Sequence, residues 1–251
     1  MNMANYTCIL LDADNTLLDF DAAERQALED TLQSFSLSCD AAAVDTYRRV
    51  NRELWDSLAK GEINRNKLFN VRFARFLRAL GQEDGGNSQK MNDYYEEQLS
   101  HHADVLPGAL DALNELAEVA TLAMVTNGTL SVQEPRIKAS GVEPYLDGVF
   151  ISEKLGAAKP SPKFFELALR ELGITNREKV LVVGDDLFAD IKGGQNAGID
   201  TCLFNPSEVE NTKGVRPKYT VRSYEELYQI VMEPEELENV GMRNRRHMGD
   251  G

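Results

Sequence analysis

Residues 6–19 read YTCILLDADNTLLD, an apolar run that ends abruptly in an acidic one. The first part, residues 6–11, is short, apolar and partly β-branched, which is typical of a buried strand. The polar part begins at Asp12 and predicts a loop. We therefore expect a strand of the protein core to deliver Asp12 and Asp14 to one edge of a sheet.

The same pattern, an apolar run followed by polar residues, occurs twice more along the chain. Residues 121–125 (TLAMV) precede Thr126-Asn127-Gly128, and residues 179–183 (KVLVV) precede Gly184-Asp185-Asp186. Weaker strand candidates are residues 148–151 and 201–204. Three buried strands that end in polar residues indicate a parallel sheet with a functional edge, because ligands bind at the carboxyl ends of such strands.

Helical patterns fill the gaps between these strands. They cover residues 107–118, 131–140 and 162–172. Ser161 is a natural N-cap, Pro162 suits the first helical position, and Gly173 suits the left-handed position after a helix. Strand and helix alternate between residues 104 and 230, which predicts an α/β fold with a mostly parallel sheet and helices on both faces.

Residues 20–103 break this alternation, because they show helical periodicity without a convincing strand. Four helices fit, at residues 22–35, 42–60, 64–80 and 88–101. We interpret the segment as an all-helical cap inserted after the first strand, with residues 1–19 and 104–232 forming the catalytic core. Residues 233–251 lose apolar periodicity, predict a C-terminal extension and are assigned no function.

Composition limits the possible partners. Hydrophobic residues make up 42% of the 251 residues and charged ones 27%, the usual balance of a globular protein. The formal net charge of −14 opposes binding to nucleic acid polymers or anionic membranes, which need clustered Lys and Arg. We expect a small anionic substrate and a monomer or weak dimer.

The cysteines and the apolar runs predict the location. Cys8, Cys39 and Cys202 form no close pair in sequence, and Cys8 and Cys202 lie in apolar runs, which predicts buried thiols. No segment approaches the roughly 20 apolar residues of a membrane span. These features predict a cytoplasmic protein without a membrane partner.

Several polar residues converge on the edge of the predicted sheet. They are Asp12, Asp14, Thr126, Asn127, Gly128, Asp185, Asp186, Asp190 and Lys159, the last from the stretch GAAKPSP. Carboxylates crowded together must take up protons or share a cation. Ligation by oxygen alone favours Mg²⁺, with Asp12, Asp14, Asp185 and Asp186 as its candidate ligands.

This set of residues suits the cleavage of a phosphate monoester. Mg²⁺ and Lys159 offset the negative charge of the phosphate, while the Thr126 hydroxyl and the backbone N–H groups near Asn127 and Gly128 bind its oxygens. The spacing Asp12-x-Asp14 places both carboxylates beside one phosphorus atom. We assign Asp12 as the nucleophile that forms an aspartyl phosphate, and Asp14 as the acid and later the base.

The motifs DADNTL, TNG, KPSP and GDDLFAD resemble the four motifs of the haloacid dehalogenase superfamily, in the order found in that family. The resemblance implies a Rossmann-like core, a helical cap after the first motif, and Mg²⁺ held by Asp12, Asp185 and the backbone carbonyl of Asp14. It further implies that Asp190 orients the site, including Lys159. Asp186 stands where many relatives carry Ser, so its contact with the metal is left open.

Within the superfamily, DADNTLLDFDAAE and WDSLAKGEINRNKLFNVRF look similar to the pyrimidine 5′-nucleotidases that act on noncanonical nucleoside monophosphates. The founding dehalogenases lack an acid at the position of Asp14, which argues against a dehalogenase. Phosphatases or mutases for phosphoglycolate or sugar phosphates stay open. A phosphoacceptor signalling domain is the rival from another class, but it has neither an acid like Asp14 nor a large helical insert.

Cap residues are the candidates for substrate specificity. Phe20 lies where the chain crosses into the cap and could stack on a base, and Arg65, with Asn66 and Lys67, could reach a substrate. The aromatic residues Trp55, Phe69, Phe73 and Phe76 follow a helical stripe, which predicts packing. His101 and His102 show no metal-ligand spacing and are interpreted as structural or exposed.

Overall fold

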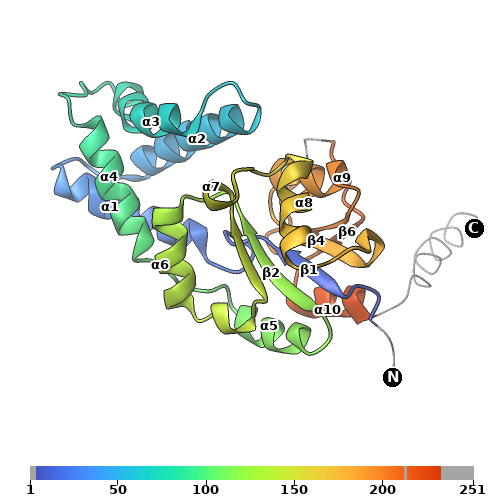
Figure 1. Cartoon of the computed structure of the whole chain (residues 1–251). Helices are drawn as coiled ribbons and strands as arrows, with labels where there is room; N and C mark the ends of the chain where they lie inside the picture. The colour runs from blue at the N-terminus through green and yellow to red at the C-terminus, as the bar shows by residue number, and fades with distance from the viewer. Residues whose placement is uncertain (1–3, 212–213, 233–251) are drawn as a thin grey trace, which may run out of the picture.

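A computed structural model describes residues 4–211 and 214–232 of the chain, and its centre is a parallel sheet of six strands (Figure 1). The strands are β1 (Cys8–Leu11), β2 (Thr121–Thr126), β3 (Gly148–Ile151), β4 (Val180–Gly184), β5 (Asp200–Phe204) and β6 (Tyr219–Val221). Their order is β3-β2-β1-β4-β5-β6, and every neighbouring pair is parallel. The predicted α/β fold with a Rossmann-like core is confirmed. The strand β6 was not predicted, because three residues show no periodicity.

The alternation of side chains along the strands produces two apolar layers. In β1, Ile9 and Leu11 join one cluster, while Cys8 and Leu10 join the cluster on the opposite face. Helices α5 (Ala109–Ala117) and α10 (Tyr224–Met232) cover the first face, and α8 (Pro162–Glu171) covers the second. The shorter elements are α7 (Ser152–Leu155), α9 (Gly193–Asn196), the 3₁₀ turns η1 (Glu143–Tyr145) and η2 (Arg177–Lys179), and the π-helical turn η3 (Leu187–Lys192).

Ends of helices follow the predicted capping residues in the core. The helix α8 begins at Pro162, and Ser161 occupies the N-cap position although its side chain makes no capping hydrogen bond. Gly173 has the positive φ of 71° that suits a glycine after a helix. In α6 (Leu130–Ser140), Gly141 ends the helix with a φ of 79°. Within the described ranges, no helix is both long and apolar enough to cross a membrane.

Four helices form the segment that we call the helical cap, residues 20–103. They are α1 (Phe20–Ser34), α2 (Ala41–Ala59), α3 (Arg65–Ala79) and α4 (Ser88–Ser100), and they lie to one side of the sheet in Figure 1. The helix α1 begins two residues earlier than predicted, because the side chain of Asp19 accepts a hydrogen bond from the backbone N–H of Ala22 and caps the helix. The separate folding of the cap as a domain stays a prediction.

An aromatic cluster holds the cap together. Tyr47, Phe73, Phe76 and Tyr95 are fully buried with ring centroids 5.3 to 6.0 Å apart. The predicted packing of Phe73 and Phe76 is therefore confirmed. Trp55 and Phe69 lie partly buried against a smaller cluster of Val50, Leu54 and Leu68.

The chain crosses between core and cap along two paired segments. Leu18 bridges Val105 in antiparallel fashion, and the N–H of Asp19 donates to the carbonyl of Asp104. Because the outgoing and returning segments are hydrogen-bonded to each other, the cap connects to the core through a single double-stranded crossing. Leu18 also bridges Asp14, so this crossing lies beside the acidic loop that follows β1. The predicted C-terminal extension, residues 233–251, lies outside the described residues.

Candidate active site

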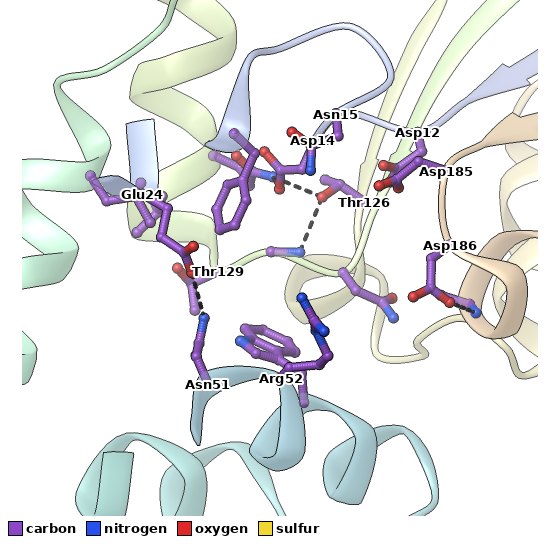
Figure 2. A pocket seen from close by; sticks show the side chains of 18 of the residues that line it. Asp12, Asp14, Asn15, Glu24, Asn51, Arg52, Thr126, Thr129, Asp185 and Asp186 are labelled. Atoms are coloured by element: carbon purple, nitrogen blue, oxygen red, sulfur yellow. Dashed lines mark hydrogen bonds between the residues drawn. The ribbon is translucent and has the colours of Figure 1, made fainter. Parts of the chain in front are cut away.

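A cavity of about 450 Å³ lies between the carboxyl edge of the sheet and the cap (Figure 2). The core residues predicted for the site all line it: Asp12, Asp14, Thr126, Asn127, Gly128, Lys159, Asp185, Asp186 and Asp190. The cap contributes Phe20, Glu24, Asn51, Arg52 and Trp55, among others. The tertiary structure thus brings together four stretches of chain that are remote in sequence. Residues of the cap form a further wall of the cavity.

Lys159 is the central cation of the site. Its Nζ donates hydrogen bonds to Asp12 Oδ1 at 2.5 Å, to Asp190 Oδ1 at 2.6 Å and to the carbonyl oxygen of Val125 at 2.8 Å. The side chain is 2% exposed. Burial alone lowers the pKa of Lys159, but the two carboxylates outweigh that effect and raise it. Lys159 therefore stays positively charged beside Asp12.

Asp190 holds Lys159 from the opposite side to Asp12. It is fully buried, and its second oxygen accepts a hydrogen bond from the N–H of Asp186 at 3.1 Å. A Cβ at Gly184 would lie 2.3 Å from the carboxyl carbon of Asp190, so this position of the motif must be glycine. This geometry provides a basis for the predicted role of Asp190 in orienting Lys159.

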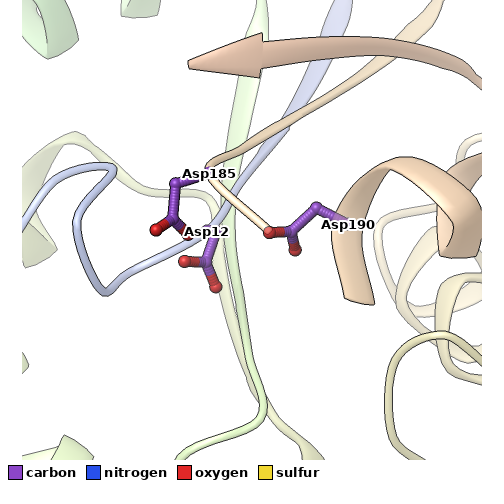
Figure 3. A group of neighbouring side chains, drawn as sticks. All are labelled: Asp12, Asp185 and Asp190. Carbon is purple, nitrogen blue, oxygen red and sulfur yellow. The ribbon is translucent and has the colours of Figure 1, made fainter. Parts of the chain in front are cut away.

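Three carboxylates form a group that suits a divalent cation. Each of Asp12, Asp185 and Asp190 offers an oxygen within 4.8 Å of the others, from the ends of β1 and β4 and from η3 (Figure 3). Burial raises the pKa of Asp12 and of Asp185, and the neighbouring carboxylates raise them further, although Lys159 opposes this. The side chain of Asp185 touches solvent in the cavity, yet the surrounding walls still desolvate it. These three carboxylates can therefore carry more negative charge than the single cation Lys159 offsets.

The donor set fits Mg²⁺. All the candidate ligand atoms are oxygens, which a hard cation prefers. Since both oxygens of Asp190 are engaged by Lys159 and by Asp186, the oxygens of Asp12 and Asp185 are the ones that would hold the ion. The predicted contribution of the Asp14 backbone carbonyl stays a prediction.

Asp186 lies beside this group with its carboxylate turned toward a helix start (Figure 2). Its Oδ1 accepts from the N–H groups of Phe188 and Ala189, both at 2.6 Å, and so caps the turn η3. Asp186 is therefore outside the carboxylate group around Asp12. Its predicted contact with the metal stays a prediction.

Thr126 and Asn127 shape the loop after β2. The Asn127 side chain donates to the carbonyl oxygen of Lys159 at 2.7 Å and accepts from the N–H of Lys159 at 2.9 Å, which ties the two motif loops together. Thr126 Oγ1 accepts from the N–H of Gly128 at 3.1 Å and from Gln133 Nε2 at 2.8 Å. Its own O–H is left to donate to a further acceptor, which suits a phosphate oxygen.

Asp14 accepts hydrogen bonds from two residues that were not predicted from the sequence. Arg136 Nη1 donates to Asp14 Oδ1 at 2.5 Å, and Gln133 Nε2 donates to Asp14 Oδ2 at 2.8 Å. Both residues lie on α6, three positions apart and thus on one face of the helix. That spacing, directly after the Thr126-Asn127-Gly128 motif, was the signal available in the sequence.

The predicted specificity residues occupy two different positions. Phe20 lines the cavity, and the guanidinium of Arg136 lies over its ring at 5.7 Å. Arg65 instead contacts the core: its Nη2 donates to the carbonyl oxygen of Asn127 at 2.8 Å and to Ser152 Oγ at 2.9 Å. Arg65 is not among the residues that line the cavity between the described parts of core and cap.

The remaining candidates in the cap lie away from the chemistry. Asn66, Lys67 and His101 are exposed. His102 is partly buried, lies 3.9 Å from Asp30, and its carbonyl oxygen accepts a hydrogen bond from Arg136. The structural interpretation of the two histidines agrees with these positions.

Known proteins match this chain over most of its length. The family model for haloacid dehalogenase-like hydrolases matches residues 6–198. Pyrimidine 5′-nucleotidase PynA from Streptococcus pneumoniae is 40% identical over 223 residues, which cover 88% of this chain and 93% of that protein. Pyrimidine 5′-nucleotidase YjjG from Escherichia coli is 35% identical and covers 89% of this chain and 96% of its own length.

Solved structures match as well. The crystal structure of YfnB from Bacillus subtilis, bound to magnesium, superimposes with a TM-score of 0.85 and 33% sequence identity. The match covers 90% of this chain and 99% of that one. Sequence and structure comparisons therefore agree on the same kind of protein.

Proposed function

This chain is a hydrolase that belongs to the haloacid dehalogenase-like hydrolase family, and on that premise we propose that it is a magnesium-dependent 5′-nucleotidase. Its substrates are nucleoside 5′-monophosphates with a pyrimidine base, and Asp12 is its covalent nucleophile. The observation that carries the proposal is the position of Asp12. This almost buried carboxylate lines the cavity, has one oxygen held by Lys159 and has Asp185 beside it.

In the first half of the reaction, a carboxylate oxygen of Asp12 attacks phosphorus. The bond between phosphorus and the ester oxygen breaks. Asp14 carries the proton that it took from water at the end of the previous turnover, and it gives that proton to the ester oxygen, so that the nucleoside leaves as an alcohol. Lys159 stabilises the charge on the transferring group because its ammonium is fixed beside Asp12. The product of this half-reaction is an aspartyl phosphate on Asp12.

In the second half, a water molecule attacks the phosphorus of the aspartyl phosphate. Asp14 takes a proton from that water, the bond between phosphorus and Asp12 breaks, and inorganic phosphate leaves. Asp12 and Asp14 return to their starting forms. When bound, Mg²⁺ supplies positive charge that offsets the charge of the phosphate and of the crowded carboxylates.

Residues around the cavity prepare it for a phosphate dianion. The O–H of Thr126 can donate to a phosphate oxygen, and Asn127 holds its loop against the backbone of Lys159. The net charge of the chain does not prevent binding, because the local cations decide the potential inside the site. The cap then closes the cavity and excludes bulk water from the reacting atoms.

The pyrimidine nucleotide as substrate is supported by the relatives and by the cap wall. PynA and YjjG are named pyrimidine 5′-nucleotidases and match nearly the whole chain. The cavity volume of about 450 Å³ is in the range of small-molecule sites. Phe20 and Trp55 offer aromatic surface for a base, and Asn51 and Arg52 offer polar groups beside it. Figure 2 shows Asn51 and Arg52 on the side of the cavity opposite Asp12.

A screen of phosphate release tests this proposal directly. Purified protein with Mg²⁺ is offered pyrimidine and purine nucleoside monophosphates, sugar phosphates and phosphoglycolate, with a chelator as the matched control. We expect the highest kcat/KM for a pyrimidine nucleotide and no release with the chelator. Preference for phosphoglycolate or a sugar phosphate would replace the substrate assignment by the alternative phosphatases of the same superfamily.

Variants of the two aspartates test the mechanism. Asp12→Asn removes the nucleophile and should abolish both turnover and the acid-stable trapping of labelled phosphate on the protein. Asp14→Asn should stop turnover on nucleotides, and retained activity would refute the proton transfer assigned to Asp14. A phosphoprotein that accumulates and releases no phosphate would favour a phosphoacceptor signalling domain.

Two properties accompany this proposal. We propose that the enzyme acts in the cytoplasm and as a monomer or weak dimer, as its thiols and composition predict. Size-exclusion chromatography with light scattering at several protein concentrations measures the second property. A stable tetramer would contradict it.

A further inference from the structure

Arg136 is a fully buried cation in the wall of the cavity. Its Nη1 donates to Asp14 Oδ1 at 2.5 Å and to Gln133 Oε1 at 2.9 Å. A guanidinium is stable in the interior only when charge and hydrogen bonds compensate the water that it loses. Asp14 provides the compensating charge while it is ionised, and when it is protonated its oxygen can still accept the hydrogen bond from Arg136. This contact therefore anchors the Asp14 loop to α6 in both forms.

Gln133 completes the contact one helical turn earlier. Its Nε2 donates to Asp14 Oδ2 at 2.8 Å and to Thr126 Oγ1 at 2.8 Å. The amide can be oriented in only one way, because Arg136 has no acceptor atom and must face the amide oxygen. Each oxygen of the Asp14 carboxylate therefore accepts a hydrogen bond from a different side chain of α6.

Gly128 makes this arrangement possible. A Cβ at Gly128 would lie 2.4 Å from Gln133 Cγ and 2.6 Å from Gln133 Nε2, closer than side chains approach. The φ of Gly128 is not positive, so glycine is required there for space and not for backbone conformation. The motif Thr126-Asn127-Gly128 thus admits the side chain that holds Asp14.

Arg136 also contacts both segments that cross between core and cap. Its Nε donates to the carbonyl oxygen of His102 at 2.8 Å, on the returning segment, and its guanidinium lies over the ring of Phe20, on the outgoing one. One side chain is thus held from three directions. The position of the Asp14 carboxylate follows from that of Arg136.

We propose that Arg136 and Gln133 are positioning residues that fix the Asp14 carboxyl group for proton transfer to the leaving group. This inference rests on the proposed function, in which Asp14 protonates the ester oxygen. An acid must come within hydrogen-bonding distance of that oxygen, and a displacement of about 1 Å is enough to cost roughly 100-fold in rate. Asp14 lies in a loop, so contacts with a rigid helix supply the precision that the loop lacks.

The dependence of rate on the leaving group tests the inference. A nucleoside 5′-monophosphate releases a poor leaving group that needs a proton, whereas p-nitrophenyl phosphate releases a stable phenolate that does not. The measured quantity is kcat/KM with Mg²⁺ present, because it reports only the steps up to the departure of the alcohol. The later role of Asp14 as a base, after the alcohol has left, therefore does not affect kcat/KM.

The informative variants are Gln133→Met and Arg136→Met. Gln133→Met keeps the length of the side chain and the Arg136–Asp14 contact. It removes the Nε2 donor to Asp14 and Thr126 and the Oε1 acceptor for Arg136. For both variants, we expect kcat/KM for the nucleotide to fall roughly 30-fold or more, and that for p-nitrophenyl phosphate to change by less than about 3-fold. Arg136→Lys should recover part of the loss.

Ile137→Val provides the matched control on the same helix. Ile137 is buried in the apolar layer against the sheet and should change both substrates equally or not at all. If Arg136→Met does not fold, Gln133→Met still decides the question. Equal losses on both substrates in an active Gln133→Met enzyme would overturn the inference alone. A wild-type enzyme inactive on both substrates would overturn the proposed function and the inference with it.

Discussion

Arg65, at the start of the cap helix α3, donates a hydrogen bond from Nη2 to the backbone carbonyl oxygen of Asn127 in the core, over 2.8 Å. Asn127 in turn is hydrogen-bonded in both directions to the backbone of Lys159. A cap residue is therefore connected through one side chain to the loop of the central lysine. The sequence predicts that Arg65 reaches the substrate, whereas in the structure its guanidinium contacts Asn127 and Ser152.

Replacement of Arg65 should loosen the cap. In Arg65→Ala the hydrogen bonds to Asn127 and Ser152 are lost, and we expect the KM for a nucleotide to rise roughly 10-fold, the equivalent of one charged hydrogen bond of about 1.4 kcal/mol. Steady-state kinetics measure this, and small-angle scattering should show a larger radius of gyration. Lys67→Ala, an exposed neighbour on α3, is the control and should match the wild type. An unchanged KM in Arg65→Ala would contradict the role of this contact.

Gly128→Ala should act through Gln133. The new methyl group displaces the Gln133 side chain, and overpacking of this kind typically costs about 1–3 kcal/mol. We expect kcat for a nucleotide to fall by roughly 10-fold or more. In the background of Gln133→Ala the same substitution should cost little, because the clash is gone. A double-mutant cycle measures the coupling, and strictly additive effects would show that the two residues act independently.

Mg²⁺ should stabilise the folded protein. The carboxylates of Asp12, Asp185 and Asp190 lie within 4.8 Å of one another, so a bound cation relieves their repulsion and its binding energy adds to stability. The melting temperature should therefore rise with Mg²⁺ concentration, as followed by circular dichroism. Asp185→Asn should melt higher than the wild type without metal and gain less from Mg²⁺. A gain equal to that of the wild type would remove Asp185 from the ligand set.

Phe20→Ala tests the stacking of a base in the cavity. The guanidinium of Arg136 lies over the Phe20 ring, and the ring still lines the cavity. Stacking of an aromatic side chain on a base contributes about 1–3 kcal/mol, so the KM for a pyrimidine nucleotide should rise roughly 10-fold. Ribose 5-phosphate lacks the base and is the control substrate. An equal rise for both substrates would exclude stacking, and Phe20→Leu separates loss of volume from loss of the ring.

The three thiols should differ in reactivity. Burial raises the pKa of Cys8 to about 12 with a further contribution from Asp147, and burial likewise raises the pKa of Cys202, so neither forms the reactive thiolate at pH 8. Cys39 is only partly buried. A thiol reagent should label Cys39 in the native protein and all three cysteines after unfolding. Cys39→Ser should abolish the native reaction, and rapid labelling of Cys8 in the folded protein would contradict this assignment.

Local chemistry decided most of what the sequence could predict. An apolar run of five or six residues before a polar loop is sufficient to identify β1, β2 and β4, because each of these strands is buried on both faces. The positions of Asp12, Lys159 and Asp185 follow from the rule that the carboxyl ends of parallel strands meet at one edge. The strand β6 and the early start of α1 were missed, because a strand of three residues and a single capping bond leave little periodicity.

Only the tertiary structure decided which side chains form hydrogen bonds and ion pairs with the motif residues. Arg136 lies 122 residues from Asp14 in sequence, and on its own it is an ordinary cation in a helix that contains a proline. Its importance comes from complete burial and from the carboxylate that it meets, and both are properties of the folded packing and not of the local pattern. The same holds for Arg65 and Asn127, which belong to different parts of the chain and meet only when the cap lies against the core. A sequence determines which groups stand at the end of a strand through short-range geometry, whereas the partners of those groups depend on how distant helices pack.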